Sequence, residues 1–293
     1  MSEPVAVVAG GSRGLGLLIA RELLARGYQV SVCARDSGEL ERARQWLGAP
    51  GRVHTRVCDI ADRAAVAGWL DEVGAHLGPV EVAITVAGII QVGPGPDMTL
   101  DHFDSAIDVM LRGPIHVARL VEPGMRQRRS GRIGTITSVG GVVSPPHLLP
   151  YATAKFGAVG FSDGLVASLA GSGVTATTVV PGLMRTGSQD RALFTGDVHA
   201  EYSWFATAAS LPVLSMDADR AARRIVDGVL AGQPLVVLTP LTWLAFRVRG
   251  LMPGTTTRLM GLATRLLPKP TGNTTATDGA SRPAGVHRRC CGC

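Results

Sequence analysis

Residues 5–26 read VAVVAGGSRGLGLLIARELLAR, and this stretch decides the fold. An apolar run of strand length, residues 5–9, passes into a glycine-rich turn and then into an amphipathic helix that stops at Gly27. Glycines permit a tight turn, and the free N–H groups at the helix start then face a pyrophosphate. The turn residues predicted to bind a dinucleotide are Gly10, Ser12, Arg13, Gly14 and Gly16.

Strand-like and helical segments alternate along the rest of the chain. Strands are predicted at residues 29–34, 53–58, 80–86, 132–137, 174–180 and 235–238, and helices at residues 62–76, 100–128, 151–169 and 217–231. This alternation predicts an α/β fold, a doubly wound parallel sheet of the Rossmann type with helices on both faces. The long helix should be interrupted or kinked near Pro114 and Pro123. Residues 183–215 lack a long periodic run, which is typical of a substrate lid.

Composition and charge divide the chain into a body and a basic end. The 293 residues, 46% of them hydrophobic, suffice for one large α/β domain. Residues 240–293 contain eight basic residues and one acid, whereas residues 1–239 contain 21 basic and 22 acidic residues. The even balance of the body argues against nucleic-acid binding. We therefore predict a domain over residues 1–239 and a distinct basic extension.

The two ends of the chain bear on location and on metal binding. The first residues, MSEPVAVVAGG, have no basic leader before an apolar stretch, which predicts a cytoplasmic protein. Cys33 and Cys58 lie in apolar, strand-like runs and are predicted to be buried thiols. Cys290, Cys291 and Cys293 crowd the last four positions, but no other Cys or His cluster has the spacing to complete a site. We therefore expect no metal.

A second stretch, residues 138–155, reads SVGGVVSPPHLLPYATAK and carries the chemistry. Tyr151 and Lys155 are four residues apart, so their side chains project from one face of a helix. An ammonium favours the phenolate, so it lowers the pKa of Tyr151 and makes a proton donor, while the Ser138 hydroxyl can hold the acceptor. Only two of the 29 basic residues are lysine, Lys155 and Lys269, which singles out the pair further.

Residues at two strand ends bear on the cofactor. The strand at residues 29–34 is followed by Arg35 rather than by the acid usual in NAD sites, so Arg13 and Arg35 are predicted to clamp the 2′-phosphate of NADP(H). Alternatively both are solvated surface arginines, Asp36 weakens the clamp, and NAD(H) stays open. Asp59 is predicted either to bond the adenine amino group or to cap the helix that follows it.

In order and spacing these residues resemble the short-chain dehydrogenase/reductase family in its compact single-domain form, over roughly residues 4–240. Two further dipeptides match the family, Ala87-Gly88 after the fourth strand and Pro181-Gly182 after the sixth, and Thr186 follows the second of them. The resemblance implies hydride transfer between a nicotinamide cofactor and a ketone or secondary alcohol. It also implies a homo-oligomer of a cofactor-binding Rossmann domain.

The resemblance assigns a role to each site residue. Tyr151 is the general acid in reduction, Lys155 bonds the cofactor ribose and lowers the pKa of Tyr151, and Ser138 orients the substrate oxygen. Thr186 bonds the nicotinamide carboxamide. Apolar residues around the expected mouth predict a lipophilic substrate. They are Leu148, Leu149, Leu183, Met184, Leu193, Phe194, Trp204 and Phe205.

The chain departs from the family pattern in two places. The family has Asn-Asn before Ala-Gly where Thr85-Val86 stands, and an Asn in the long helix where Met110 stands. That helical Asn helps to hold a water linking the lysine to solvent. Either protons take another route, or the chain is a cofactor-binding regulatory or scaffold protein with weak turnover. Retention of Ser138, Tyr151 and Lys155 favours the enzyme.

Residues 240–267 lie beyond the resemblance and follow helical spacing. Trp243 and Phe246 accompany arginines there, and a basic amphipathic helix of this kind can lie in a membrane interface. Packing over the substrate mouth or against a subunit partner is the alternative. Residues 268–293 are rich in Pro, Gly, Ser and Thr, which predicts a disordered tail.

Overall fold

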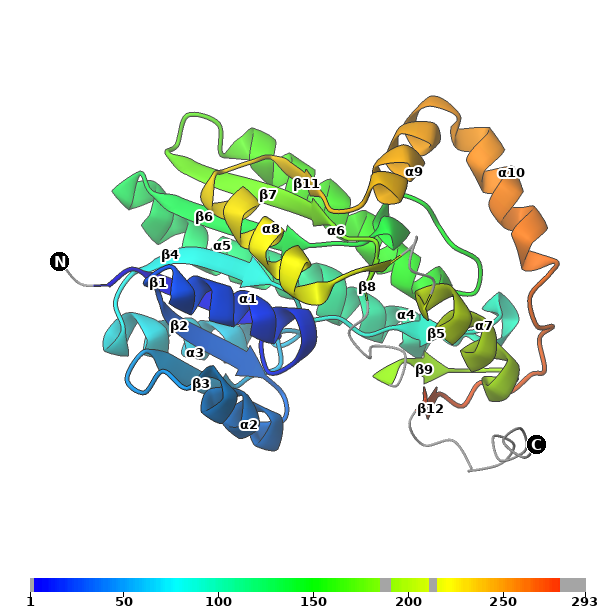
Figure 1. The fold of residues 1–293 in the computed structure, drawn as a ribbon, viewed down its shortest axis with the longest axis horizontal. Helices are drawn as coiled ribbons and strands as arrows, with labels where there is room; N and C mark the ends of the chain where they lie inside the picture. The colour runs from blue at the N-terminus through cyan, green and yellow to red at the C-terminus, as the bar shows by residue number, and fades with distance from the viewer. Residues whose placement is uncertain (1–2, 185–190, 211–214, 280–293) are drawn as a thin grey trace, which may run out of the picture.

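The computed structural model describes residues 3–184, 191–210 and 215–279. Its centre is a seven-stranded sheet in the order β11-β7-β6-β4-β1-β2-β3, in which every neighbouring pair is parallel (Figure 1). The strands are β1 (Val5–Ala9), β2 (Gln29–Ala34), β3 (Val53–Val57), β4 (Val80–Thr85), β6 (Gly131–Ile136), β7 (Val174–Val180) and β11 (Leu235–Val237). The predicted doubly wound parallel sheet is confirmed.

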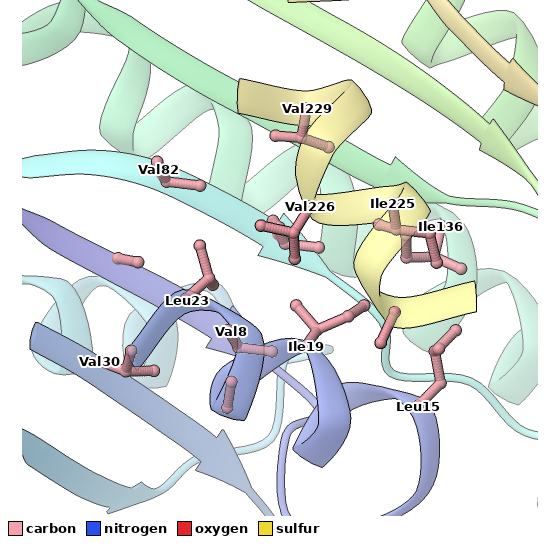
Figure 2. Close-up of a cluster of buried hydrophobic side chains, with 14 of the residues drawn as sticks. Val8, Leu15, Ile19, Leu23, Val30, Val82, Ile136, Ile225, Val226 and Val229 are labelled. Atoms are coloured by element: carbon pink, nitrogen blue, oxygen red, sulfur yellow. The ribbon is translucent and has the colours of Figure 1, made fainter. Parts of the chain in front are cut away.

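Helices cover both faces of this sheet because successive side chains of a strand point to opposite faces. Ala6 and Val8 of β1 pack under α1 (Gly14–Ala25) and α8 (Ala218–Leu230), and Figure 2 shows Ile19, Leu23, Ile225 and Val226 meeting there. The intervening positions of β1 face a second cluster. It is built from α3 (Arg63–His76), α5 (Gly113–Arg128) and α6 (Leu149–Ser168).

The long helical region is divided by a π-helical turn. α4 (Leu100–Ile107) is followed by the turn Asp108–Arg112 and then by α5, so the predicted interruption near Pro114 is present. Pro114 is the second residue of α5 and directly follows the π-helical turn and Gly113. The helix continues through Pro123, so the chain is not interrupted there. A π-helical turn of this kind often marks a functional site.

Two helices were absent from the sequence prediction. α2 (Ser37–Leu47) follows β2, with the Asp36 side chain accepting from the Glu39 N–H as its N-cap. α7 (Val198–Ser210) lies inside the segment expected to form a lid loop, flanked by β8 (Leu183–Met184), β9 (Leu193–Phe194) and β10 (Ser215–Met216). Tertiary contacts, described below, stabilise α7 in spite of its weak helical periodicity.

The extension forms two helices, α9 (Pro240–Leu251) and α10 (Pro253–Thr264), as predicted. The chain then returns to the body. The Thr271 and Gly272 N–H groups donate to the buried Asp97 carboxylate at 3.0 and 2.9 Å. β12 (Thr277–Asp278) pairs with β9, which also pairs with β5 (Gln91–Val92). Within the segment predicted to be a disordered tail, residues 271–279 thus contact a buried side-chain acceptor and a strand edge.

Candidate active site

Tyr151, Lys155 and Ser138 come together at the carboxyl end of β6. Ser138 is the second residue after the end of β6. Tyr151 and Lys155 lie in the first two turns of α6. Lys155 Nζ lies 6.0 Å from the centroid of the Tyr151 ring, and the Ser138 hydroxyl is near enough to Tyr151 to lower the pKa of its phenol. The turn after Ser138 can approach α6 because of its glycines. A Cβ on Gly140 would lie 2.8 Å from Tyr151 Cε1.

Burial controls the electrostatics of this group. Burial raises the pKa of Tyr151, and the hydrogen bond with Ser138 opposes that rise. Lys155 was expected to lower the pKa of Tyr151, but in the protein alone burial raises it, and the one cause that lowers it is Ser138. The Lys155 ammonium is directed instead to the Ile136 carbonyl oxygen, to which it donates at 2.9 Å. Burial also lowers the pKa of Lys155 to about 8.

The residues present fit a dinucleotide. An ammonium has three N–H groups, and the described residues give Lys155 one acceptor, so two donors remain for a ligand. In the turn after β1, Gly10 has φ +86° and a Cβ there would strike Ala87, so β1 and β4 end in close contact. Gly14 has φ +54° and an ideal Cβ on it would meet no atom within 4 Å. The turn therefore presents its backbone to open space at the start of α1.

Beside this turn the predicted phosphate-binding residues meet an acid. Ser12 Oγ donates to the Glu39 carboxylate at 3.0 Å, and Arg13 Nε lies 3.5 Å from the same carboxylate. The sequence argument did not single out Glu39. Arg35 lies exposed just after β2, with no ion pair in the described part of the chain. Arg13 at the turn is thus already ion-paired with Glu39, whereas Arg35 has no ion-pair partner among the described residues.

Asp59 stands after β3, and its two predicted roles are now separable. The helix cap belongs to Asp62, whose side chain accepts from the Ala64 and Ala65 N–H groups of α3. Asp59 makes a tighter turn, in which one carboxylate oxygen accepts from the Ala61 N–H at 3.0 Å. The cap role that the sequence left open is therefore taken by Asp62, and Asp59 is left half-buried at the strand end.

The remaining matched residues line the same end of the sheet. An ideal Cβ on Gly88 would lie 3.4 Å from Met110 Sδ and 3.9 Å from Lys155 Nζ. The Pro181 carbonyl oxygen accepts from the Val139 N–H at 2.8 Å. A Cβ on Gly182 would meet the hydroxyls at the start of α9. Thr186 lies outside the described residues.

Two further features lie near Tyr151, Met110, which the sequence had singled out, and His147, which it had not. Met110, only 1% exposed, lies in the π-helical turn and packs with Ala154 against Tyr151. His147, in the loop before α6, has φ +61° and its Nδ1 lies 2.8 Å from the buried Glu201 carboxylate of α7. Trp204 Nε1 donates to the same carboxylate at 2.7 Å. A lone acid within the apolar-rich segment of residues 198–210 was the available signal for this pairing.

The fold and site together define a dinucleotide-binding protein with a phenol, an ammonium and a hydroxyl where the strands end. Comparison with known proteins agrees. The model of the short chain dehydrogenase family matches residues 4–193. A 3-oxoacyl-[acyl-carrier-protein] reductase, MabA of Mycobacterium avium, is 36% identical over 180 residues, which are 61% of this chain and 67% of the relative. An acetoacetyl-CoA reductase of Paracoccus denitrificans is 34% identical over 182 residues, 62% and 74% of the two chains.

A solved structure extends the likeness to three dimensions. A variant of actinorhodin polyketide ketoreductase, solved with NADPH, has a TM-score of 0.72 and 27% identity, and the match covers 82% of this chain and 98% of that one. The chain belongs to the short-chain dehydrogenase family and is an oxidoreductase of the C=O/CH–OH class. The family model ends at residue 193, so α7 to α10 lie outside its match.

Proposed function

We propose that this protein is an NADP(H)-dependent reductase of a lipophilic ketone, able to run in reverse on the secondary alcohol. The observation that carries the proposal is the placing of Ser138, Tyr151 and Lys155 beside an open glycine turn. When bound, the nicotinamide supplies the hydride. The turn N–H groups hold the pyrophosphate, and the two spare Lys155 donors bind ribose hydroxyls.

Two observations support NADP(H) over NAD(H). The position after β2 is Arg35, which is exposed and free to bind a 2′-phosphate, and Arg13 stands at the glycine turn. The similar ketoreductase was solved with NADPH. Asp59 is left to bond the adenine amino group, with one carboxylate oxygen turned to Ala61. Thr186, with Pro181 and Gly182, is assigned to the nicotinamide side.

Proton transfer belongs to Tyr151. Because burial raises its pKa, the phenol stays protonated at neutral pH and is ready to donate to the oxygen of a ketone that is being reduced. Ser138, whose hydroxyl lies beside Tyr151, holds that oxygen in place. These two conditions suit the proton-donating step of ketone reduction.

The surroundings of Tyr151 support a lipophilic substrate. Leu148, Phe194 and Phe205 form a buried cluster with Tyr151 packed against it, and Trp204 adjoins them. Leu149 does not belong to this wall, since it is 47% exposed. Side chains of Leu183 and Met184 are not described. The relatives named above reduce 3-oxoacyl and acetoacetyl groups, which are ketones on acyl chains.

Purified protein should be tested on ketones of increasing chain length with NADPH and with NADH. We expect turnover with NADPH that improves as the ketone lengthens, and activity confined to small polar ketones would reject the lipophilic substrate. Tyr151→Phe should abolish NADPH consumption while cofactor binding, followed by fluorescence, remains. The second candidate is a cofactor-binding regulatory protein, favoured by Met110 in place of the family Asn. It is supported if wild type binds NADPH but consumes none.

Assembly and location complete the proposal. We propose a homo-oligomer, supported by the exposed Leu100 and Leu120 on α4 and α5, with light scattering as its test. Cytoplasmic action is supported by Cys33 and Cys58, which are free thiols. None of the helices in the described ranges is long and apolar enough to cross a bilayer.

Contact of α9 and α10 with a membrane surface is proposed from their exposed apolar side chains. Trp243 is 50% exposed and Leu251 is 83% exposed, and both are accompanied by arginines. Replacing Trp243 and Leu251 together with serine should release the protein from anionic vesicles in co-sedimentation. Unchanged co-sedimentation, or none in wild type, would contradict membrane contact.

A further inference from the structure

A cavity of about 650 Å³ lies between the catalytic loop and α10. One wall comes from Pro145 in the loop before α6 and from Leu149 and Phe156 on α6 itself. The opposite wall comes from α10, with Met260 facing inward. Met260 also packs in the cluster of Val142, Val143 and Phe246, so the second wall is attached to the body. The volume suits a small-molecule ligand.

This cavity is separate from the site of Tyr151. Leu149 and Phe156 are seven residues apart and so share one face of α6. At 100° per residue, that face is turned roughly 130° away from the face that bears Tyr151 and Lys155. The cavity therefore opens on the outer side of α6. A ligand in it has no access to the catalytic residues through the helix.

The polar lining of the cavity has one sign of charge. Arg249, Arg265 and Lys269 line it, and none of its lining residues is an acid. Residues 240–269, all of them described, include five basic residues and no Asp or Glu. Arg249, Arg265 and Lys269 form no ion pair within the described ranges, whereas body arginines such as Arg126 are paired with acids. Unpaired cations beside an apolar wall favour binding of a ligand that has both an anionic group and an apolar part.

We propose that this cavity binds a single-chain anionic amphiphile, with the acyl chain between α6 and Met260 and a carboxylate or phosphate on Arg249, Arg265 and Lys269. Charge complementarity argues for this occupant, because a neutral lipid would leave three cations beside it without a counter-ion. The inference concerns a site outside the catalytic centre and does not rest on the proposed reaction.

Calorimetry with full-length protein and decanoate tests the proposal. Arg249→Glu/Arg265→Glu should weaken decanoate binding roughly tenfold or more, because two charge-assisted contacts are lost. The matched control is Arg247→Glu/Arg258→Glu, which changes the charge of the same two helices equally but at positions outside the cavity lining. It should alter binding less than about twofold. Equal weakening by both pairs would overturn the site, since it would show general attraction to the basic extension.

Two further experiments test the charge of the ligand and its position in the cavity. Decyltrimethylammonium should bind at least about tenfold more weakly than decanoate, and equal binding would overturn the anionic ligand. Gly261→Leu places a side chain into the cavity at a helical position with open space, and should block decanoate binding. Gly250→Leu, also helical with open space but outside the lining, is its control. Both replace glycine in a helix with a better helix former, so loss of binding would not reflect unfolding.

Discussion

Lys155→Met should make the protein more stable and inactive. The ammonium is 4% exposed and burial alone lowers its pKa from 10.5 to about 8. At 1.36 kcal/mol for each pH unit, keeping this side chain charged at neutral pH costs roughly 3 kcal/mol of folding free energy. The substitution also removes the hydrogen bond to the Ile136 carbonyl oxygen, and this loss lowers the free energy of unfolding by about 1 kcal/mol. Methionine, similar in length and apolar, should therefore raise the free energy of unfolding by roughly 2 kcal/mol.

The stability gained by Lys155→Met depends on pH. The unfolded chain keeps the Lys155 proton up to its ordinary pKa of 10.5, whereas the native state releases it near 8. Between these values the unfolded state binds more protons, so wild-type stability rises with pH there. The advantage of Lys155→Met is therefore complete below pH 8 and disappears as the pH approaches 10.5.

Urea unfolding at about pH 7 and about pH 10 measures both quantities. Lys269→Met is the matched control, because Lys269 is the other lysine of the chain and is exposed. It should change stability by less than about 0.5 kcal/mol at either pH. The reasoning is refuted if Lys155→Met is no more stable than wild type at the lower pH, or if its advantage is the same at both.

Four other outcomes are expected. Glu39→Gln removes a negative charge beside the glycine turn and should tighten NADPH binding about threefold to tenfold more than NADH binding in fluorescence titrations; an equal effect on both would exclude a role at the 2′-phosphate. Met110→Asn should raise kcat for ketone reduction while lowering stability by about 1–3 kcal/mol, and an unchanged kcat would assign proton transfer to a route that bypasses this position. Glu201→Ala should cost about 2–5 kcal/mol in urea unfolding, because it leaves the buried His147 Nδ1 and the Trp204 N–H without their shared hydrogen-bond partner; a loss below about 1 kcal/mol would contradict these hydrogen bonds. Ketone reduction should slow as the pH rises past about 8, where Lys155 loses its charge, and a flat profile would mean that the charge on this lysine is not needed.

Local sequence patterns were enough to predict the sheet and the grouping of Ser138, Tyr151 and Lys155. Each central strand is an apolar, β-rich run, and parallel connectivity brings the ends of β1, β4 and β6 to one edge. α7 was not predicted because its position depends on Glu201, which is stabilised by His147 from 54 positions away in the chain. The same holds for β12, whose order depends on β9 and Asp97. Contacts of this range have no local signature.

The sign of the pKa shift at Tyr151 could not be predicted either. The sequence places Lys155 four residues after Tyr151, but it does not show how deeply the phenol is buried, and burial is the largest cause of the raised pKa. Glu39 is a similar case. Its charge is visible in the sequence, but its approach to Ser12 and Arg13 depends on where α2 packs.

The two attachments of the extension have a consequence for dissection of the protein. α9 starts against Gly182, and the chain after α10 is held at Asp97 and by β12 on β9, so residues 240–270 form a strap anchored at both ends. A protease that cuts at Met252, between the two helices, should release no fragment under native conditions. Truncation at residue 240 would remove a strand from the small sheet that carries Phe194 and so disturb the wall beside Tyr151. Replacing the strap by a short flexible linker, with β12 kept, is the deletion that leaves the substrate side intact.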